Sequence, residues 1–183
     1  MDDGTDTLLV IGGQLPAILK AIVIIWYVLG LGIAGLGLWR WATAGGNRGG
    51  GSHTPSAGIG MFVFGSLMLN LVGTVSSAFA TIYGSGASPL FVLSAVPTGD
   101  DRMQMWIAVL MNIFVVFGWY AAGRGLFNLA HAKTRQDGGY GSGLVHLAAA
   151  VALCNPQLFA YSIGATLGAN GTVSLLIPPP PTF

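Results

Sequence analysis

Long apolar stretches interrupted by short polar segments dominate the chain. Lys20 and Arg40 enclose 19 residues without a charge, and another 46 uncharged residues separate His53 from Asp100. A third stretch of 21 residues precedes Arg124, and no charge follows Asp137. A helix needs about 20 apolar residues to cross the hydrocarbon core of a bilayer. Because the stretches do not alternate apolar with polar residues, strands are the weaker interpretation. The pattern predicts an all-α integral membrane protein with four transmembrane helices, at 18–41, 58–82, 105–130 and 143–168.

The composition supports this interpretation. Of the 183 residues, 53% are hydrophobic and only 7% are charged, whereas a soluble domain carries roughly 25% charged residues. A soluble enzyme, a coiled coil and a charged disordered chain are therefore excluded as classes. The formal net charge of +1 provides no basic field for a nucleic-acid backbone, so we expect no sequence-specific nucleic-acid binding.

The charges between the apolar stretches predict the orientation. The segment between the first two helices carries Arg40, Arg48 and no acid, and the segment between the last two is also basic. The opposite side of the membrane receives most of the aspartates. Short loops rich in Lys and Arg remain in the cytoplasm. We therefore expect a bacterial inner-membrane protein with a periplasmic N-terminal tail (1–17), a first hairpin (18–82), a periplasmic linker (83–104), a second hairpin (105–168) and a Pro-rich periplasmic tail (169–183).

The two predicted hairpins resemble one another in sequence. With an offset of 88 residues, eight of the 21 residues from 22 to 42 are identical to their counterparts, which lie in 110–130. With an offset of 85, Asn70 corresponds to Asn155 and Gly58 to Gly143. Order, loop placement and topology agree as well, as expected for an internal repeat. The sequence thus predicts two tandem hairpins of the same orientation, a parallel repeat.

Small residues recur on the first helix of each hairpin. The stretch 30–35 also has the spacing GxGxxG of a dinucleotide loop, but such a loop needs a preceding strand and a helix that starts at it. Packing is the better interpretation, because small residues let helix backbones approach closely in lipid. We expect one small-residue pair to pack within the subunit and the other between subunits. The candidate packing residues are Gly30, Ala34, Gly35, Gly118, Ala122 and Gly123.

A few polar residues fall inside or at the ends of the predicted spans. Asn70 and Asn155 lie near the middle of the bilayer, where they either line a conduit or form a structural hydrogen bond between helices; the structural role is favoured. Pro156 should bend its helix. His146 is either a pH switch or, more plausibly, bonded to the preceding helix or a headgroup. The residues expected at lipid headgroups are Arg40, Arg124, Lys133 and Arg135.

Candidate catalytic chemistry is sparse. One cysteine, Cys154, excludes an intrachain disulfide, and the three histidines are scattered. No nucleophile–base pair, carboxylate pair or phosphate loop is recognisable. We therefore expect no enzymatic activity, no catalytic residue, no metal site and no cofactor, with bound phospholipid as the one small molecule anticipated.

The stretch from Gly143 to Asn155, GLVHLAAAVALCN, resembles a motif of a known family. It is similar to the segment G-x-x-H-[I/L]-x-G/A-G/A-x-x-x-x-N of small membrane proteins in Dot/Icm-type (type IVB) secretion and conjugation systems, the TraQ-like and IcmC/DotE-like proteins. Gly143, His146 and Asn155 match it, whereas Ala148 and Ala149 stand where glycine is commoner. The resemblance implies a polytopic inner-membrane protein without enzymatic activity.

Two classes of function follow. The first is a structural inner-membrane component of a type IVB secretion or conjugative DNA-transfer apparatus, or a pilin-like subunit of a conjugative pilus. Its expected partners are lipids, other subunits of the apparatus and further copies of itself. The second is a stand-alone channel, holin or transporter. No acidic residue lies inside a predicted span, which weakens the ion-coupled transporter because such proteins use ionisable groups there.

Overall fold

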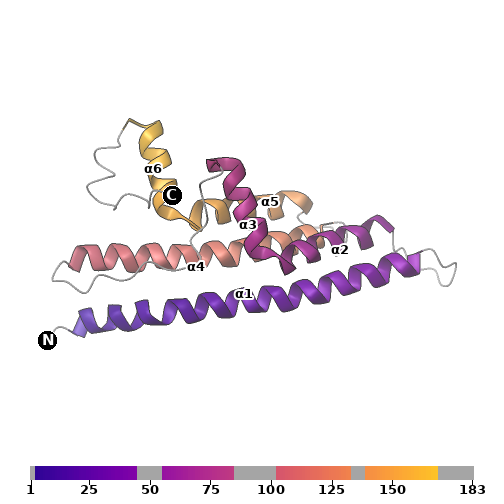
Figure 1. Cartoon of the computed structure of the whole chain (residues 1–183), viewed down its shortest axis with the longest axis horizontal. Helices are drawn as coiled ribbons and strands as arrows, with labels where there is room; N and C mark the ends of the chain where they lie inside the picture. Colours follow the sequence, from indigo (N-terminus) through magenta and orange to yellow (C-terminus); the bar gives the residue numbers. More distant parts are fainter. Residues whose placement is uncertain (1–2, 45–54, 85–101, 133–138, 169–183) are drawn as a thin grey trace.

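The computed structural model describes residues 3–44, 55–84, 102–132 and 139–168, and the regular elements in these ranges are all helices. They are α1 (Asp3–Ala44), α2 (Pro55–Leu69), α3 (Leu71–Tyr83), α4 (Arg102–Ala130), α5 (Gly139–Leu153) and α6 (Pro156–Thr166). In Figure 1, α1 and α4 run side by side in the same direction, and α2 and α5 return along them. The short helices α3 and α6 project from one side of this bundle (Figure 1).

The helix boundaries differ from the predicted ones in two ways. Helix α1 begins at Asp3 and continues through Pro16, so most of the expected tail 1–17 is helical. The expected helices 58–82 and 143–168 are each two helices, bent by 89° and 90° at a break. Most of the linker 83–104, the tail 169–183 and the parts 45–54 and 133–138 of the loops expected on the cytoplasmic side lie outside the described residues.

Helices α1 and α4 are long and apolar enough to cross a membrane, and the number of candidate spans rises to four if each bent pair is one span. With 42 residues, α1 is about 63 Å long, roughly twice the thickness of the hydrocarbon core. Helices α2 and α5, with 15 residues each, reach only about 22 Å. The described chain is thus an all-helical protein compatible with a multi-pass membrane protein.

Glycines hold α1 against α2 and α4 against α5. A Cβ built on Gly37 would lie 2.8 Å from the carbonyl oxygen of Gly58, and one on Gly125 would lie 3.0 Å from that of Gly143. These are backbone contacts, so no flexible side chain can give way. The two contacts are equivalent under the repeat, because offsets of 88 and 85 relate Gly37 to Gly125 and Gly58 to Gly143.

A second pair of glycine contacts is also equivalent under the repeat. A Cβ on Gly30 would lie 3.0 Å from the backbone nitrogen of Leu69, and one on Gly118 would lie 2.6 Å from that of Cys154. The same offsets relate Gly30 to Gly118 and Leu69 to Cys154. Both halves of the chain therefore use the same positions for close backbone approach.

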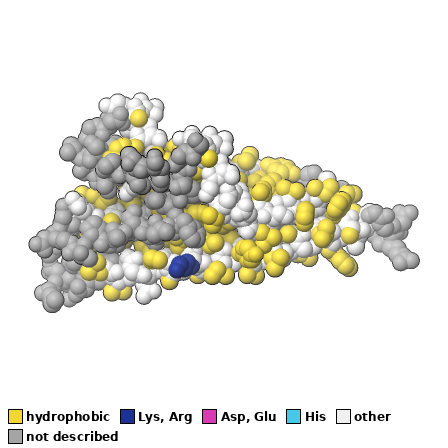
Figure 2. All heavy atoms as spheres, viewed as in Figure 1, with side chains coloured by type: hydrophobic (Ala, Val, Ile, Leu, Met, Phe, Trp, Pro, Cys, Tyr) yellow, Lys and Arg dark blue, Asp and Glu magenta, His cyan; other side chains and the backbone are white. Residues whose placement is uncertain are grey.

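The core lies where α4 meets the first two helices. Trp119 and Trp26 belong to the same buried cluster, together with Met61 and Met68 of α2. The outer surface is apolar as well: Trp39, Val28 and Leu31 of α1 are largely exposed. Figure 2 shows hydrophobic side chains along the length of the described surface in this view, with little basic surface among them. Such a surface suits lipid or another apolar helix rather than water.

Candidate functional site

The two bent helix pairs break at the repeated asparagines. Asn70 separates α2 from α3, and Asn155 separates α5 from α6. The bends are 89° and 90°, so α3 and α6 leave the bundle at nearly the same angle. A break inside an apolar segment frees backbone donors and acceptors, which have to find partners because lipid supplies none. The residues at the breaks are therefore the polar centres of the fold.

The break at Asn155 is closed by a helix cap. The side-chain oxygen Oδ1 of Asn155 accepts a hydrogen bond from the backbone nitrogen of Leu158 at 3.1 Å. Pro156 occupies the first turn of α6, where the missing N–H of a proline would have had no helical partner. Asn155 is only 2% exposed. The bend that Pro156 predicts is confirmed, and the cap explains why an asparagine precedes it.

The break at Asn70 is built differently. Asn70 is exposed and makes no side-chain cap hydrogen bond. Its amide lies over Gly73, where an added Cβ would be 2.5 Å from Nδ2. Thr74 holds the break instead, since its Oγ1 lies 3.1 Å from the carbonyl oxygen of Leu67 and 2.9 Å from that of Asn70. Both carbonyls also accept a backbone hydrogen bond, that of Leu67 from the Asn70 nitrogen and that of Asn70 from the Thr74 nitrogen, so the Thr74 hydroxyl is an additional donor at the break.

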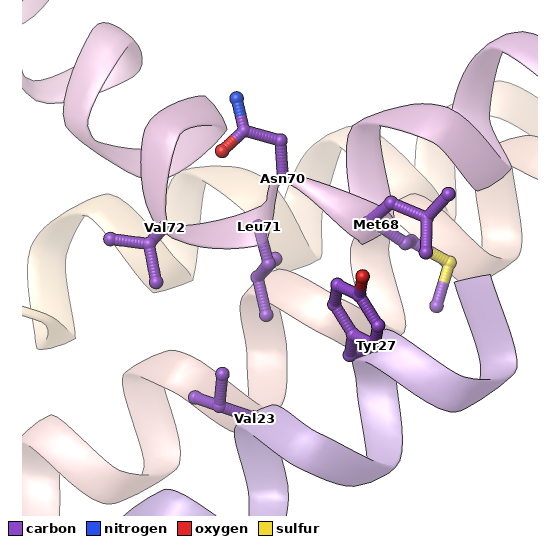
Figure 3. A pocket seen from close by; sticks show the side chains of 7 residues that line it. Val23, Tyr27, Met68, Asn70, Leu71 and Val72 are labelled. Carbon is purple, nitrogen blue, oxygen red and sulfur yellow. The ribbon is translucent and has the colours of Figure 1, made fainter. Parts of the chain in front are cut away.

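A pocket of about 130 Å³ opens at the Asn70 break. Residues of α1, α2 and α3 line it: Val23, Tyr27, Met68, Leu69, Asn70, Leu71 and Val72. Figure 3 shows the amide of Asn70 on the opposite side of the chain from Leu71, turned away from the Tyr27 ring. Tyr27 and Asn70 are the lining residues whose side chains carry a polar group, and the other lining side chains are apolar. A hydroxyl and an amide form no acid–base or nucleophile pair.

No group of three His, Cys, Asp or Glu residues that could hold a metal ion occurs in the part of the chain that the structure describes. Cys154 is buried, and its Sγ lies 2.9 Å from the position of a Cβ on Gly118. The thiol therefore packs at the α4–α5 contact, as a small apolar group does.

Five of the six predicted packing residues are buried within the chain, namely Gly30, Ala34, Gly118, Ala122 and Gly123. The expectation that one small-residue pair is left for contacts between subunits is wrong. Gly30 and Gly118 both meet the partner helix of their own hairpin. Gly35 is the exception: it is exposed, and an added Cβ would meet nothing within 4 Å. Its repeat equivalent, Gly123, lies against the indole ring of Trp26.

The predicted polar residues inside the spans bond locally. Nδ1 of His146 lies 2.7 Å from the carbonyl oxygen of Ser142 in its own helix, and the expected bond to the preceding helix or a headgroup stays a prediction. Nδ1 of His131 pairs with the Phe127 carbonyl in the same way, at 3.0 Å. The cap made by Asn155 is also local, and the expected bond between helices stays a prediction.

The predicted headgroup residues have protein contacts where they are described. Nη1 of Arg40 donates to Sδ of Met61 on α2 at 3.1 Å. Nη1 of Arg124 donates to the hydroxyl of Tyr120 at 3.1 Å on an exposed face. Lys133 and Arg135 lie outside the described residues.

Sequence reasoning missed two polar positions on α4. Asn112 is buried, at 2% exposure. Asn128 donates from Nδ2 to Oγ of Ser142 on α5 at 3.3 Å. Neither residue has an amide counterpart on α1, because Ile24 and Arg40 stand at the equivalent positions. The repeat therefore gave no signal for an amide at these positions.

No protein-family model, no curated protein and no solved structure matches this chain.

Proposed function

We propose that this protein is a structural, non-enzymatic subunit of the inner-membrane part of a type IVB secretion or conjugative DNA-transfer apparatus. One observation carries the proposal. The three residues that match the family motif all shape one bent helix pair: Gly143 contacts α4, His146 bonds within α5 and Asn155 caps α6. A motif built from framework residues fits a protein whose role is to present a shape to neighbouring subunits.

The bends favour a particular placement in the membrane. If the basic loops face the cytoplasm, α2 and α5 rise about 22 Å from that side. Helices α3 and α6 then lie along the opposite face, each adding about 10 Å of helix diameter. The sum is close to the roughly 30 Å of the hydrocarbon core. In this arrangement Leu71, Val75 and Phe79 of α3 face the bundle, where they are buried.

Deletion and complementation in a host with such an apparatus test the proposal. Deletion should abolish DNA or effector transfer, and the wild-type chain should restore it. Gly143→Leu should fail to restore transfer, because an added Cβ would lie 2.5 Å from the Leu129 side chain and 3.0 Å from the Gly125 carbonyl. Gly141→Leu is the matched control, since a Cβ there meets nothing within 4 Å.

Two further measurements distinguish the structural subunit from a pilin-like subunit and from a stand-alone channel. The purified protein should bring down other membrane subunits of the apparatus, and recovery in an extracellular filament would favour the pilin-like role. Normal transfer after deletion would contradict the proposal. Ion conductance by the protein alone in liposomes, combined with normal transfer, would instead support a stand-alone channel.

A further inference from the structure

One stripe of α4 is buried by the first half of the chain. Its members are spaced by three and four residues along one side of the helix, as a packing stripe requires. They share the buried cluster with Trp26, Met61 and Met68 of α1 and α2, except Gly123, which lies directly against the Trp26 ring. We call this the α4 stripe: Val116, Trp119, Gly123, Leu126 and Ala130.

The equivalent stripe of α1 is exposed throughout. The offset of 88 residues relates the α4 stripe to Val28, Leu31, Gly35, Leu38 and Ala42, which we call the α1 stripe. Val28 is 61% exposed whereas Val116 is 9% exposed, and Leu31 is 60% exposed whereas Trp119 is fully buried. Four of the five pairs are identical residues, and the pair that differs is Leu31 and Trp119. The α1 stripe thus keeps the surface of a packed helix without having a partner among the residues that the structure describes.

The second half of the chain carries an apolar surface that is complementary to the α1 stripe. The residues of α1 that face α4 include Trp26 and Ile22, which belong to the shared core or pack against it. Their equivalents on α4 are Phe114 and Leu110. Leu110 is 48% exposed and Phe114 is half-buried. An apolar ridge like the one that covers the α4 stripe is therefore available on α4 itself, on another side of the helix.

We propose that copies of this protein associate head to tail, with the Leu110–Phe114 ridge of one copy packed on the α1 stripe of the next. This contact between two copies would have the same geometry as the contact between the two halves of one chain. The copy-to-copy contact is heterologous, so it produces a ring where the rotation closes and a filament where it does not. The occupant is a second copy because the repeat supplies both complementary surfaces. This inference deepens the proposed function by naming one partner of the subunit.

The intrachain contact specifies which residues meet between copies. Trp26 lies against Gly123. Shifting both positions by 88 residues in opposite directions places Phe114 of one copy against Gly35 of the next. Gly35 leaves the room that such an aromatic ring needs, since nothing lies within 4 Å of its Cβ position.

Disulfide cross-linking in native membranes tests this contact. In a full-length Cys154→Ala background, Gly35→Cys combined with Phe114→Cys should give a ladder of dimers, trimers and larger species after oxidation with copper phenanthroline. Leu36→Cys with Phe114→Cys is the control. Leu36 is one residue away, is 55% exposed, and lies on a different side of α1, about 100° around the helix axis. We expect at least fivefold less cross-linked product from the control pair.

A second variant tests the same contact without cysteines. Gly35→Leu should shift the particles in native nanodiscs from multimers to single subunits, with the membrane level unchanged. Gly60→Leu is the control, because a Cβ at Gly60 also meets nothing within 4 Å and its equivalent, Val145, is exposed. Equal cross-linking by both cysteine pairs would show that copies collide without the proposed register. No cross-linking by either pair would show that the α1 stripe contacts lipid or another protein. Either result would overturn the inference.

Measuring transfer with the same variants separates the two proposals. Loss of multimers by Gly35→Leu with normal transfer would leave the self-contact standing and count against the proposed function. Absence of multimers in the wild type, with transfer that still depends on the protein, would do the reverse.

Discussion

The indole ring of Trp26 on α1 occupies the space into which a side chain at Gly123 on α4 would have to extend. Both residues lie in the packing between the two halves of the chain, where α4 meets α1 and α2. The absence of a Cβ at Gly123 therefore sets how closely the halves approach.

Gly123→Leu should destabilise the subunit by about 1–3 kcal/mol, the usual cost of overpacking. Trp26 is large and buried, so it cannot move aside without opening the core. Thermal unfolding in a mild detergent measures the effect. Gly35→Leu is the matched variant at the equivalent position, and it should unfold at the wild-type temperature. Similar losses in both variants would show that the Trp26–Gly123 contact is not the cause.

The closeness of α1 and α2 depends on Gly37. Gly37→Val should separate the two helices, because its Cβ would lie 2.8 Å from the Gly58 carbonyl and would also meet the backbone of Phe62. Spin labels on the outer faces of α1 and α2 should report a larger distance. Gly32→Val places the same side chain where nothing lies within 4 Å, so its distance distribution should match that of the wild type.

The two breaks should respond differently to loss of their asparagines. Asn155→Ala removes the bond to the Leu158 nitrogen and should cost about 1 kcal/mol, as for other helix caps. Asn70→Ala removes no cap bond and should cost clearly less. Chemical unfolding of both variants in the same detergent makes the comparison. An equal or larger loss for Asn70→Ala would contradict the assignment of its support to Thr74.

The orientation is open to labelling from outside the cell. In a Cys154→Ala background, a cysteine replacing Gly50 should be protected from an impermeant maleimide, and one replacing Thr98 should react. The basic residues beside position 50 motivate this result. Reaction at position 50 in intact cells would invert the topology, and disruption of the cells provides the control for reactivity.

The sequence was sufficient for the helical class because its apolar stretches are long and nearly free of charge. It also predicted the bend at Pro156, since a proline removes a backbone donor. The bend at Asn70 has no proline to signal it, and the only sequence indication was that Asn70 is the counterpart of Asn155. The start of α1 was missed because Asp3, Asp6 and Pro16 are poor membrane residues, although a helix outside the hydrocarbon core tolerates them.

The burial of the packing glycines could not be predicted from the sequence pattern. Gly35 and Gly123 are identical in type and equivalent in the repeat, yet one is exposed and the other buried. The contact between the two halves occurs once, so in the described ranges α4 has a neighbour on that side and α1 has none. No local property of either glycine encodes this difference.

Seven hydroxyls on α1, α2, α3 and α6 approach the carbonyl four residues earlier in their own helices, those of Thr43, Ser66, Thr74, Ser77, Thr81, Ser162 and Thr166. A hydroxyl bonded in this way needs no acceptor from another helix or from water, because it already donates its proton to a backbone carbonyl. The surfaces of these helices can therefore contact either a lipid chain or another protein without leaving a hydroxyl donor unpaired. Serine and threonine residues on a helix surface usually favour a polar neighbour, but with these hydroxyls paired internally the surface is equally compatible with lipid and with protein.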